Sequence, residues 1–151
     1  MIYLISLGLN GLKTISLEAI EAVKECNIIY IERYTSLIPE SNEELTTFFK
    51  KNVIELSRKD VENNLRQLLE KAEKSKIAIL IGGDCLTATT HYSMILEARK
   101  NNINIKVIHG SSILIAVGET GLFLYKFGAS TTIPFENKNI KTPLQIIANN
   151  K

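Results

Sequence analysis

The residues best placed to do chemistry follow one short apolar run, Ile77–Ile81. That run leads into Gly82, Gly83 and Asp84 and then into the threonine-rich segment CLTATTH. Glycines let a ligand lie against the backbone, a carboxylate accepts hydrogen bonds, and threonine hydroxyls both donate and accept them. The pattern is typical of a buried parallel strand that carries a ligand-binding turn at its carboxyl end. The same residues also fit a tight turn in which Asp84 caps the next helix, and both interpretations stay open at this point.

Several other kinds of site do not match the sequence. The segment GLNG at residues 8–11 lacks the GxGxxG spacing of a classical dinucleotide-binding fold, although Glu32 stands about where that fold places its ribose-binding acid. No Walker A or GxSxG motif occurs, and Cys85, His91 and His109 have no standard ligand spacing, so we expect no metal. We interpret His91 as a local hydrogen-bonding residue and leave the role of His109 open.

This lack of acid–base machinery is compatible with methyl transfer from a sulfonium to an amine. Such a transfer is an in-line displacement of a good leaving group, so it needs alignment, a dry site and a neutral nucleophile more than a catalytic dyad. Loops at strand ends can meet these needs. The catalytic residues, including any group that takes the amine proton, stay unknown.

Five apolar runs that alternate with helical patterns must position this turn. The runs cover residues 2–7, 28–31, 53–56, 77–81 and 105–108. Helices are expected after the N-cap Ser16, after a capping box of Ser41 with Glu44, over 61–72, and over about 89–101 with Tyr92, Ile95 and Leu96 turned inward. This order predicts an α/β fold, in which a five-stranded parallel sheet carries helices on both faces and ligands at the carboxyl ends of its strands.

The composition changes after about residue 110. We expect a short helix to start at Ser111–Ile113, one more strand at Ser130–Pro134, and a last helix over Leu144–Ala148 with Pro143 at its first position. The final stretch from Glu136 is too small to form a domain of its own.

Composition favours a soluble cytoplasmic protein. The 151 residues are 45% hydrophobic, which suffices for one core, and a spread net charge of +2 marks no nucleic-acid surface. The apolar runs are far shorter than the ~20 residues that a membrane helix needs, and Met1 leads directly into an expected strand without a signal peptide. Cys26 and Cys85 lack CxxC spacing, which favours free thiols in a reducing compartment.

Six segments closely resemble the diphthine synthase family, which has the tetrapyrrole-methylase-like fold. They are ISLGL (Ile5–Leu9), YTS (Tyr34–Ser36), GGDCLTATTH (Gly82–His91), VIHGSSI (Val107–Ile113), AVGETGLFLYKFG (Ala116–Gly128) and TIPF (Thr132–Phe135). They occur in the family's order over essentially the whole chain, and TATTH and LYKFG distinguish it from precorrin methylases of the same fold. The resemblance implies an S-adenosyl-L-methionine-dependent methyltransferase of diphthamide biosynthesis whose cofactor lies between two α/β domains.

By motif position, the resemblance also implies five cofactor-binding residues. They are Leu9, Asp84, Thr87, Ser112 and Ile113. The implied reaction is N-methylation of the 3-amino-3-carboxypropyl-histidine of elongation factor 2, and the implied assembly is a homodimer.

Three departures from the family pattern affect these expectations. Cys85 stands where the family usually has proline, which removes a fixed φ from the turn, and Ser6 replaces a usual glycine with little expected effect. The family's second domain is nearly all missing. We therefore expect residues 1–112 to form an amino-terminal cofactor-binding domain, and residues 113–151 to form a connecting helix and the truncated start of a second α/β domain.

Three functional alternatives follow from that truncation. The chain is a fragment, a truncated product or half of a split enzyme that a carboxyl-terminal half complements, or else it is a non-catalytic remnant or binding module with an incomplete cofactor cleft. A third alternative is methylation of another substrate within the same fold family. The apolar stretch Leu122–Phe127 should drive dimerisation or aggregation, unless it folds back on its own domain.

Overall fold

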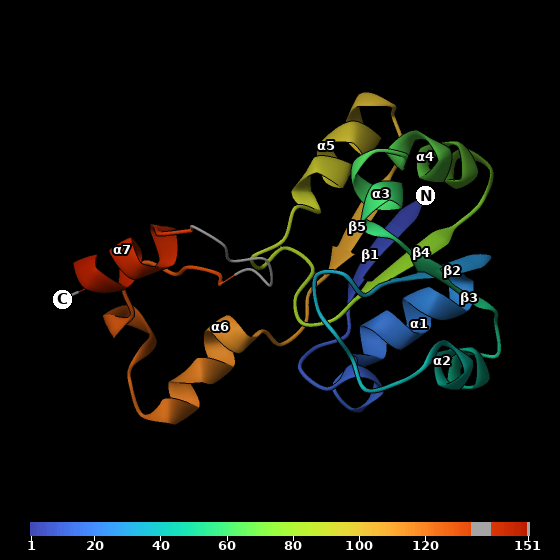
Figure 1. Cartoon of the computed structure of the whole chain (residues 1–151). Coiled ribbons are helices and arrows are strands. Elements are labelled where there is room, and N and C mark those ends of the chain that lie inside the picture. The colour runs from blue at the N-terminus through green and yellow to red at the C-terminus, as the bar shows by residue number, and fades with distance from the viewer. Residues whose placement is uncertain (134–139, 151) are drawn as a thin grey trace. The chain divides into compact units, whose positions relative to one another are not determined.

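The five apolar runs form one parallel sheet in the computed structural model, which describes residues 1–133 and 140–150. The strands are β1 (Ile2–Ser6), β2 (Ile28–Glu32), β3 (Val53–Leu56), β4 (Ile77–Ile81) and β5 (Ile105–Ile108). Their order in the sheet is β3-β2-β4-β1-β5 (Figure 1). The register pairs Ser6 with Ile81 and Ile5 with Ile108, so β4, β1 and β5 end at one edge. The predicted five-stranded parallel sheet is confirmed.

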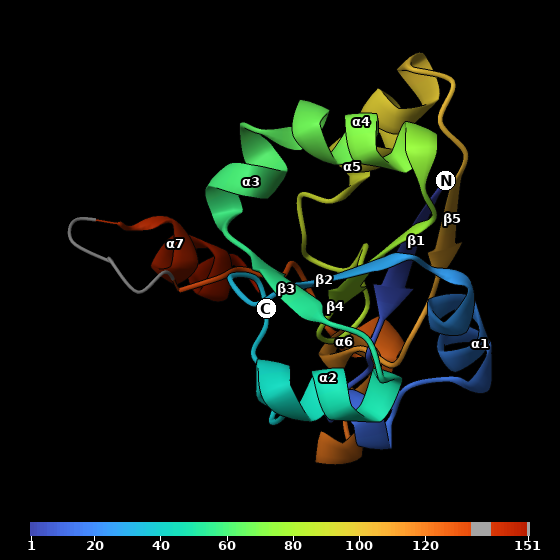
Figure 2. The same ribbon diagram turned by 90° about the vertical axis from the view of Figure 1, so that its right-hand side faces the viewer.

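Helices cover both faces of this sheet. They are α1 (Leu17–Glu25), α2 (Asn42–Phe49), α3 (Arg58–Glu62), α4 (Leu65–Lys74) and α5 (Tyr92–Lys100). Helices α3, α4 and α5 lie on one face of the sheet and α1 and α2 on the other (Figures 1 and 2). Leu4 of β1 packs in a cluster with residues of α3, α4 and α5, whereas its neighbour Ile5 packs in a cluster with residues of α1 and α2. Because successive side chains point to opposite faces, each strand supplies both clusters, which explains why the central strands β1 and β4 are buried along their whole length.

Local capping explains where the helices begin. The Ser16 side chain accepts a hydrogen bond from Ala19 N, and Ser41 with Glu44 forms both bonds of a capping box, so both predicted helix starts are confirmed. The single helix predicted over 61–72 is wrong, because α3 ends before Asn63 and α4 begins after Asn64. A further capping box of Ser57 with Asp60 starts α3.

The buried face of α5 also differs from the prediction. Met94, Ile95 and Ala98 are buried, whereas Tyr92 and Leu96 are 54% and 44% exposed. The sequence offered several apolar stripes on this helix, and packing against the sheet selects one of them.

The chain divides into two compact units, Met1–Ile113 and Leu114–Lys151. The helical elements around and beyond the boundary are α6 (Ile113–Ala116), η2 (Val117–Thr120), η3 (Leu124–Lys126) and α7 (Thr142–Asn149). Residues 130–133 form no strand, which contradicts the prediction for Ser130–Pro134 as far as the described residues reach. The last helix is present and begins one residue before Pro143. The carboxamide of Asn150 hydrogen-bonds both the N–H and the carbonyl of Ala129.

Candidate functional site

The topology of the sheet makes the carboxyl ends of β1 and β4 a switch point, where the two strands connect to opposite faces. These strands are neighbours, yet β1 continues to α1 on one face and β4 continues to α5 on the other. Ligands of open α/β sheets bind where adjacent connections leave toward opposite faces. The loop that begins at Gly8 and the turn that begins at Gly82 are therefore the candidate site.

Two glycines join these loops directly. Gly8 N donates to Gly83 O over 3.0 Å, and Gly83 N donates to Gly8 O over 2.8 Å. Both residues have positive φ, 74° and 71°. A Cβ at Gly8 would lie 2.7 Å from Thr14 Oγ1, whereas a Cβ at Gly83 would meet nothing within 4 Å. Gly83 thus presents bare backbone that a ligand can approach closely.

Asp84 connects the β4 turn to the loop that follows β5. Its Oδ1 accepts hydrogen bonds from Leu86 N (2.9 Å) and the Thr87 hydroxyl (3.2 Å). Its Oδ2 accepts from Gly110 N (3.2 Å) and lies 2.8 Å from His109 Nδ1. Burial raises the pKa of Asp84, but the hydrogen bonds from Leu86, His109 and Gly110 outweigh burial and hold the pKa below its usual value. The site therefore carries an anionic carboxylate at neutral pH.

The loops after β1 and β5 are also joined to each other. Leu9 N donates to Ser111 Oγ over 3.2 Å. Ser112 is buried, while Leu9 and Ile113 are 48% and 66% exposed. Four of the five predicted binding residues thus lie on the three loops that leave β1, β4 and β5, and Ile113 begins α6 directly after the third loop. Their contact with a cofactor stays a prediction.

These residues fit S-adenosyl-L-methionine in their chemistry. The carboxylate of Asp84 favours a nearby cation, and the exposed apolar side chains of Leu9 and Ile113 can pack against a nucleoside. The open backbone at Gly83 provides the close approach that such a ligand needs. His109 is the most exposed partner of Asp84, with 66% of its side chain accessible, so it is the partner most easily exchanged for a ligand.

Sequence reasoning missed several residues that build the site. Ser6, expected to matter little, accepts a hydrogen bond from Cys85 N over 3.0 Å and so anchors the turn to β1. The contacts of Asp84 with His109 and Gly110 were also missed, because they depend on the strand order. Burial raises the pKa of the Cys85 thiol to about 11, so this thiol stays protonated and is no nucleophile.

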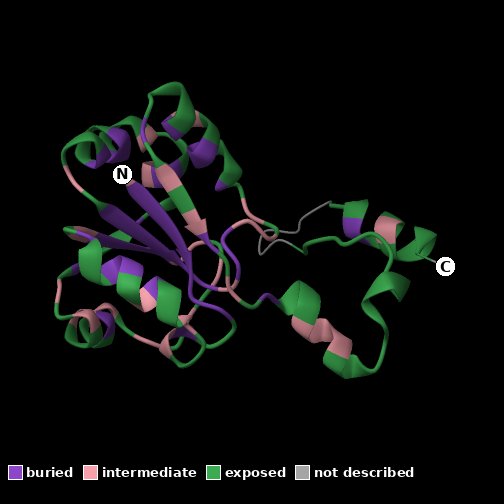
Figure 3. Ribbon diagram, turned by 180° about the vertical axis from the view of Figure 1, so that it is seen from behind, coloured by how far each residue is buried: buried purple, intermediate pink, exposed green. Residues whose placement is uncertain are grey.

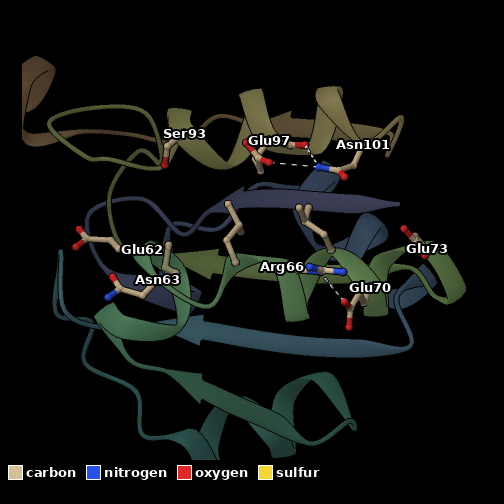
Figure 4. Close-up of a pocket in the computed structure, with 11 residues that line it drawn as sticks. Glu62, Asn63, Arg66, Glu70, Glu73, Ser93, Glu97 and Asn101 are labelled. Atoms are coloured by element: carbon tan, nitrogen blue, oxygen red, sulfur yellow. Dashed lines mark hydrogen bonds and ion pairs between the residues drawn. The ribbon is translucent and has the colours of Figure 1, made fainter.

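A separate groove of about 740 Å³ lies between α4 and α5 (Figure 4). Its lining includes Glu62 at the end of α3 and Arg66, Glu70 and Glu73 of α4. The exposed Arg66 pairs with Glu70 at 3.1 Å, which is typical of solvated surface. The five predicted binding residues do not line this groove.

The described residues contain neither a cluster of metal ligands nor a membrane-spanning helix. Within residues 1–133 and 140–150, no three histidine, cysteine or acidic side chains gather as metal ligands would. Over the same residues, no helix has both the length and the apolar character that crossing a membrane requires.

Comparisons with known proteins identify relatives over the whole chain. Diphthine synthase of Archaeoglobus fulgidus is 41% identical over 152 residues, which cover 100% of this chain and 60% of the relative. Diphthine methyl ester synthase of Saccharomyces cerevisiae is 40% identical over 140 residues, which cover 92% of this chain and 47% of the relative. The chain therefore spans about half the length of the curated relatives it matches.

Solved structures agree with the sequence relatives. A crystal structure of diphthine synthase matches with a TM-score of 0.94 at 40% identity, over 99% of this chain and 59% of that one. A putative diphthine synthase from Entamoeba histolytica matches with a TM-score of 0.75 at 38% identity, over 85% and 48% of the two chains. Residues 1–145 also match the family described as tetrapyrrole (corrin/porphyrin) methylases. Because the family model, the sequence relatives and the solved structures each match nearly all of this chain, the chain belongs to the tetrapyrrole methylase family and is homologous, over the whole of its own 151 residues, to diphthine synthase.

Proposed function

We propose that this chain supplies part of the S-adenosyl-L-methionine site of a diphthine synthase-type methyltransferase. One observation carries the proposal: three loops at the switch point of the sheet hold an anionic Asp84 beside the open backbone of Gly83. The family membership and the homology to diphthine synthase support the same activity.

Each predicted binding residue has a role that its surroundings allow. When bound, S-adenosyl-L-methionine supplies an electrophilic methyl group on a sulfonium. Asp84 would orient the ligand through its charge, and Leu9 and Ile113 would contact its apolar surface. Thr87 and Ser112 would contribute hydroxyl groups. Acid–base chemistry at the acceptor is assigned to no residue.

The proposed substrate is elongation factor 2, and the proposed reaction is N-methylation of its 3-amino-3-carboxypropyl-histidine in the cytoplasm. The relatives' names differ in product, because the archaeal protein is called a diphthine synthase and the yeast protein a diphthine methyl ester synthase. An ester forms on a carboxylate oxygen, whereas N-methylation occurs on the amine. We propose the amine as acceptor and a homodimer, or a complex with a carboxyl-terminal half, as the active assembly.

Titration calorimetry with S-adenosyl-L-methionine tests the cofactor site on the 151-residue chain. We expect micromolar binding by the wild type and its loss in Asp84→Asn. Asp60→Asn is the matched control, because it removes an equal charge from the exposed capping box of α3. No binding by the folded wild type would favour the second candidate, a non-catalytic remnant or binding module.

Co-expression with the carboxyl-terminal half of a full-length relative tests the reaction. Mass spectrometry of elongation factor 2 should then show added methyl groups that survive mild alkali, since alkali hydrolyses esters and leaves N-methyl groups. Alkali-labile methyl groups would instead identify the carboxylate as acceptor. Inactive paired halves, beside an active full-length relative, would contradict a catalytic role for this chain.

A further inference from the structure

Two buried ionisable side chains outside the proposed contacts face each other near the Asp84 turn. Glu32 ends β2 and His91 precedes α5, and both side chains are fully buried. Glu32 Oε2 lies 3.3 Å from His91 Nε2, and neither atom has a well-aligned hydrogen bond within the described part of the chain. The other oxygen, Oε1, accepts a hydrogen bond from Thr35 N. This burial also shows that Glu32 is not a ribose-binding acid.

The neighbours of the His91 ring determine how many protons the pair needs. Nδ1 lies 3.2 Å from the carbonyl oxygen of Cys85, which can only accept, so Nδ1 must carry a proton. A neutral ring with its proton there would turn a bare Nε2 toward a carboxylate, and the lone pairs would repel. Such a pair would also leave a net negative charge in the interior. Among the described residues, no other cation forms an ion pair with Glu32.

A second proton between Nε2 and Oε2 removes both problems. It gives either an imidazolium with an ionised Glu32 or a neutral imidazole with a protonated Glu32. In both forms the pair carries no net charge, and each of the two ring nitrogens has a hydrogen-bonding partner.

The pair joins two loops at the candidate site. On one side, the carbonyl of Cys85 lies 3.2 Å from His91 Nδ1 and also accepts a hydrogen bond from the Thr89 hydroxyl, while Cys85 N donates to Ser6 Oγ. The residue next to Asp84 is therefore held at both its N–H and its C=O. On the other side, Glu32 holds Thr35, whose loop packs on the exit of β4. A Cβ at Gly82 would lie 3.0 Å from Ser36 Oγ and from Ile38 Cγ2.

We propose that Glu32 and His91 are positioning residues that hold the Asp84 turn through a buried pair with two protons and no net charge. The positioning role rests on the proposed function, namely that this turn binds S-adenosyl-L-methionine. The proton count does not depend on it.

Nuclear magnetic resonance of the intact chain, labelled at histidine nitrogens and glutamate carboxyl carbons, tests the proton count. We expect a proton on Nδ1 of His91, and with it either a proton on Nε2 or a protonated carboxyl at Glu32. A ring with a single proton beside an ionised Glu32 would overturn the proposal. This measurement needs no cofactor and no variant.

Calorimetry with S-adenosyl-L-methionine tests the positioning role. Glu32→Gln should keep the wild-type dissociation constant, because its amide can donate to Nε2 while its carbonyl accepts from Thr35 N. Glu32→Leu and His91→Phe remove these bonds and should weaken binding at least about tenfold, equivalent to about 1.4 kcal/mol. Rescue by glutamine but not by leucine, in folded variants, distinguishes positioning from bulk packing.

Tyr30→Phe is the matched control. Tyr30 lies two residues earlier on the same face of β2, and its hydroxyl accepts a hydrogen bond from Lys71 Nζ over 2.9 Å. We expect its dissociation constant to stay at the wild-type value. If Glu32→Leu and His91→Phe also bind like the wild type, the positioning role is wrong. If the wild type itself does not bind, the proposed function fails for this chain, and the resonance experiment still decides the proton count.

Discussion

The units Met1–Ile113 and Leu114–Lys151 contain similar kinds of apolar residues but bury them to very different extents. Every residue of β1 and β4 is buried, whereas Pro143 is the one buried residue among those described after Ile113 (Figure 3). Phe123 and Tyr125 are 67% and 78% exposed. The difference shows that apolar composition stabilises a fold only where a second layer covers it, as helices cover this sheet on both faces.

Truncating a core side chain should give the largest effect. Ile79 lies at the centre of β4 with no exposed surface, so Ile79→Ala should lower the free energy of unfolding by about 2–5 kcal/mol. Leu124→Ala, in the second unit, should change it by no more than about 0.5 kcal/mol, because that residue is 44% exposed. Urea unfolding measures both. Equal losses at the two positions would contradict the difference between the units.

Removing the Asp84 charge should have the next largest effect, within the first unit. Asp84→Asn weakens four hydrogen bonds and should cost about 1–3 kcal/mol at neutral pH. Because the pKa of Asp84 is lowered on folding, its contribution is present above the usual value of about 4 and is lost as pH falls through the lower folded value.

The gap in unfolding free energy between wild type and Asp84→Asn should therefore narrow below about pH 4. Urea unfolding at a series of acidic pH values measures this difference, with the surface variant Glu73→Gln as control. A gap that is constant across this range would mean that the charge of Asp84 does not stabilise the fold.

Substitutions at two positions with left-handed backbone should change the free energy of unfolding by smaller amounts and in opposite directions. Gly83 and Ala88 both have positive φ, 71° and 56°. Gly83→Ala should cost about 1 kcal/mol, and Ala88→Gly should gain up to about 1 kcal/mol, reduced by the greater entropy of glycine in the unfolded chain. Thermal unfolding of the two variants checks the signs. A stabilising Gly83→Ala would show that the turn relaxes without left-handed backbone.

The smallest effect on stability is expected in the second unit. The rings of Phe123 and Tyr125 are stacked, with centroids 5.6 Å apart, and both are exposed. Changing both to serine should alter the free energy of unfolding by no more than about 0.5 kcal/mol. The same change should reduce self-association, since exposed aromatic patches bind one another. Light scattering over a concentration series measures the self-association. A wild type that stays monomeric at high concentration would contradict the predicted interface.

Local sequence patterns predicted the elements, and long-range order determined the site. The strands and the caps at Ser16 and Ser41 were readable because each depends on a few neighbouring residues. The sequence did not predict that β4 inserts between β2 and β1. The contacts that depend on this strand order were therefore missed, including those of Asp84 with His109 and of Glu32 with His91. The start of α3 had a local signal, a serine–aspartate capping box at Ser57, which the longer amphipathic pattern obscured.

The bridge between Gly8 and Gly83 has a consequence for the order of folding. It joins the first loop of the chain to one that emerges from ribosomes much later, and it requires β4 to insert between two strands that precede it in the sequence. Loop closure over such separations is slow compared with local helix formation. We therefore expect the Gly8–Gly83 bridge, and with it the proposed binding of S-adenosyl-L-methionine, to form later in refolding than the first gain of helical signal.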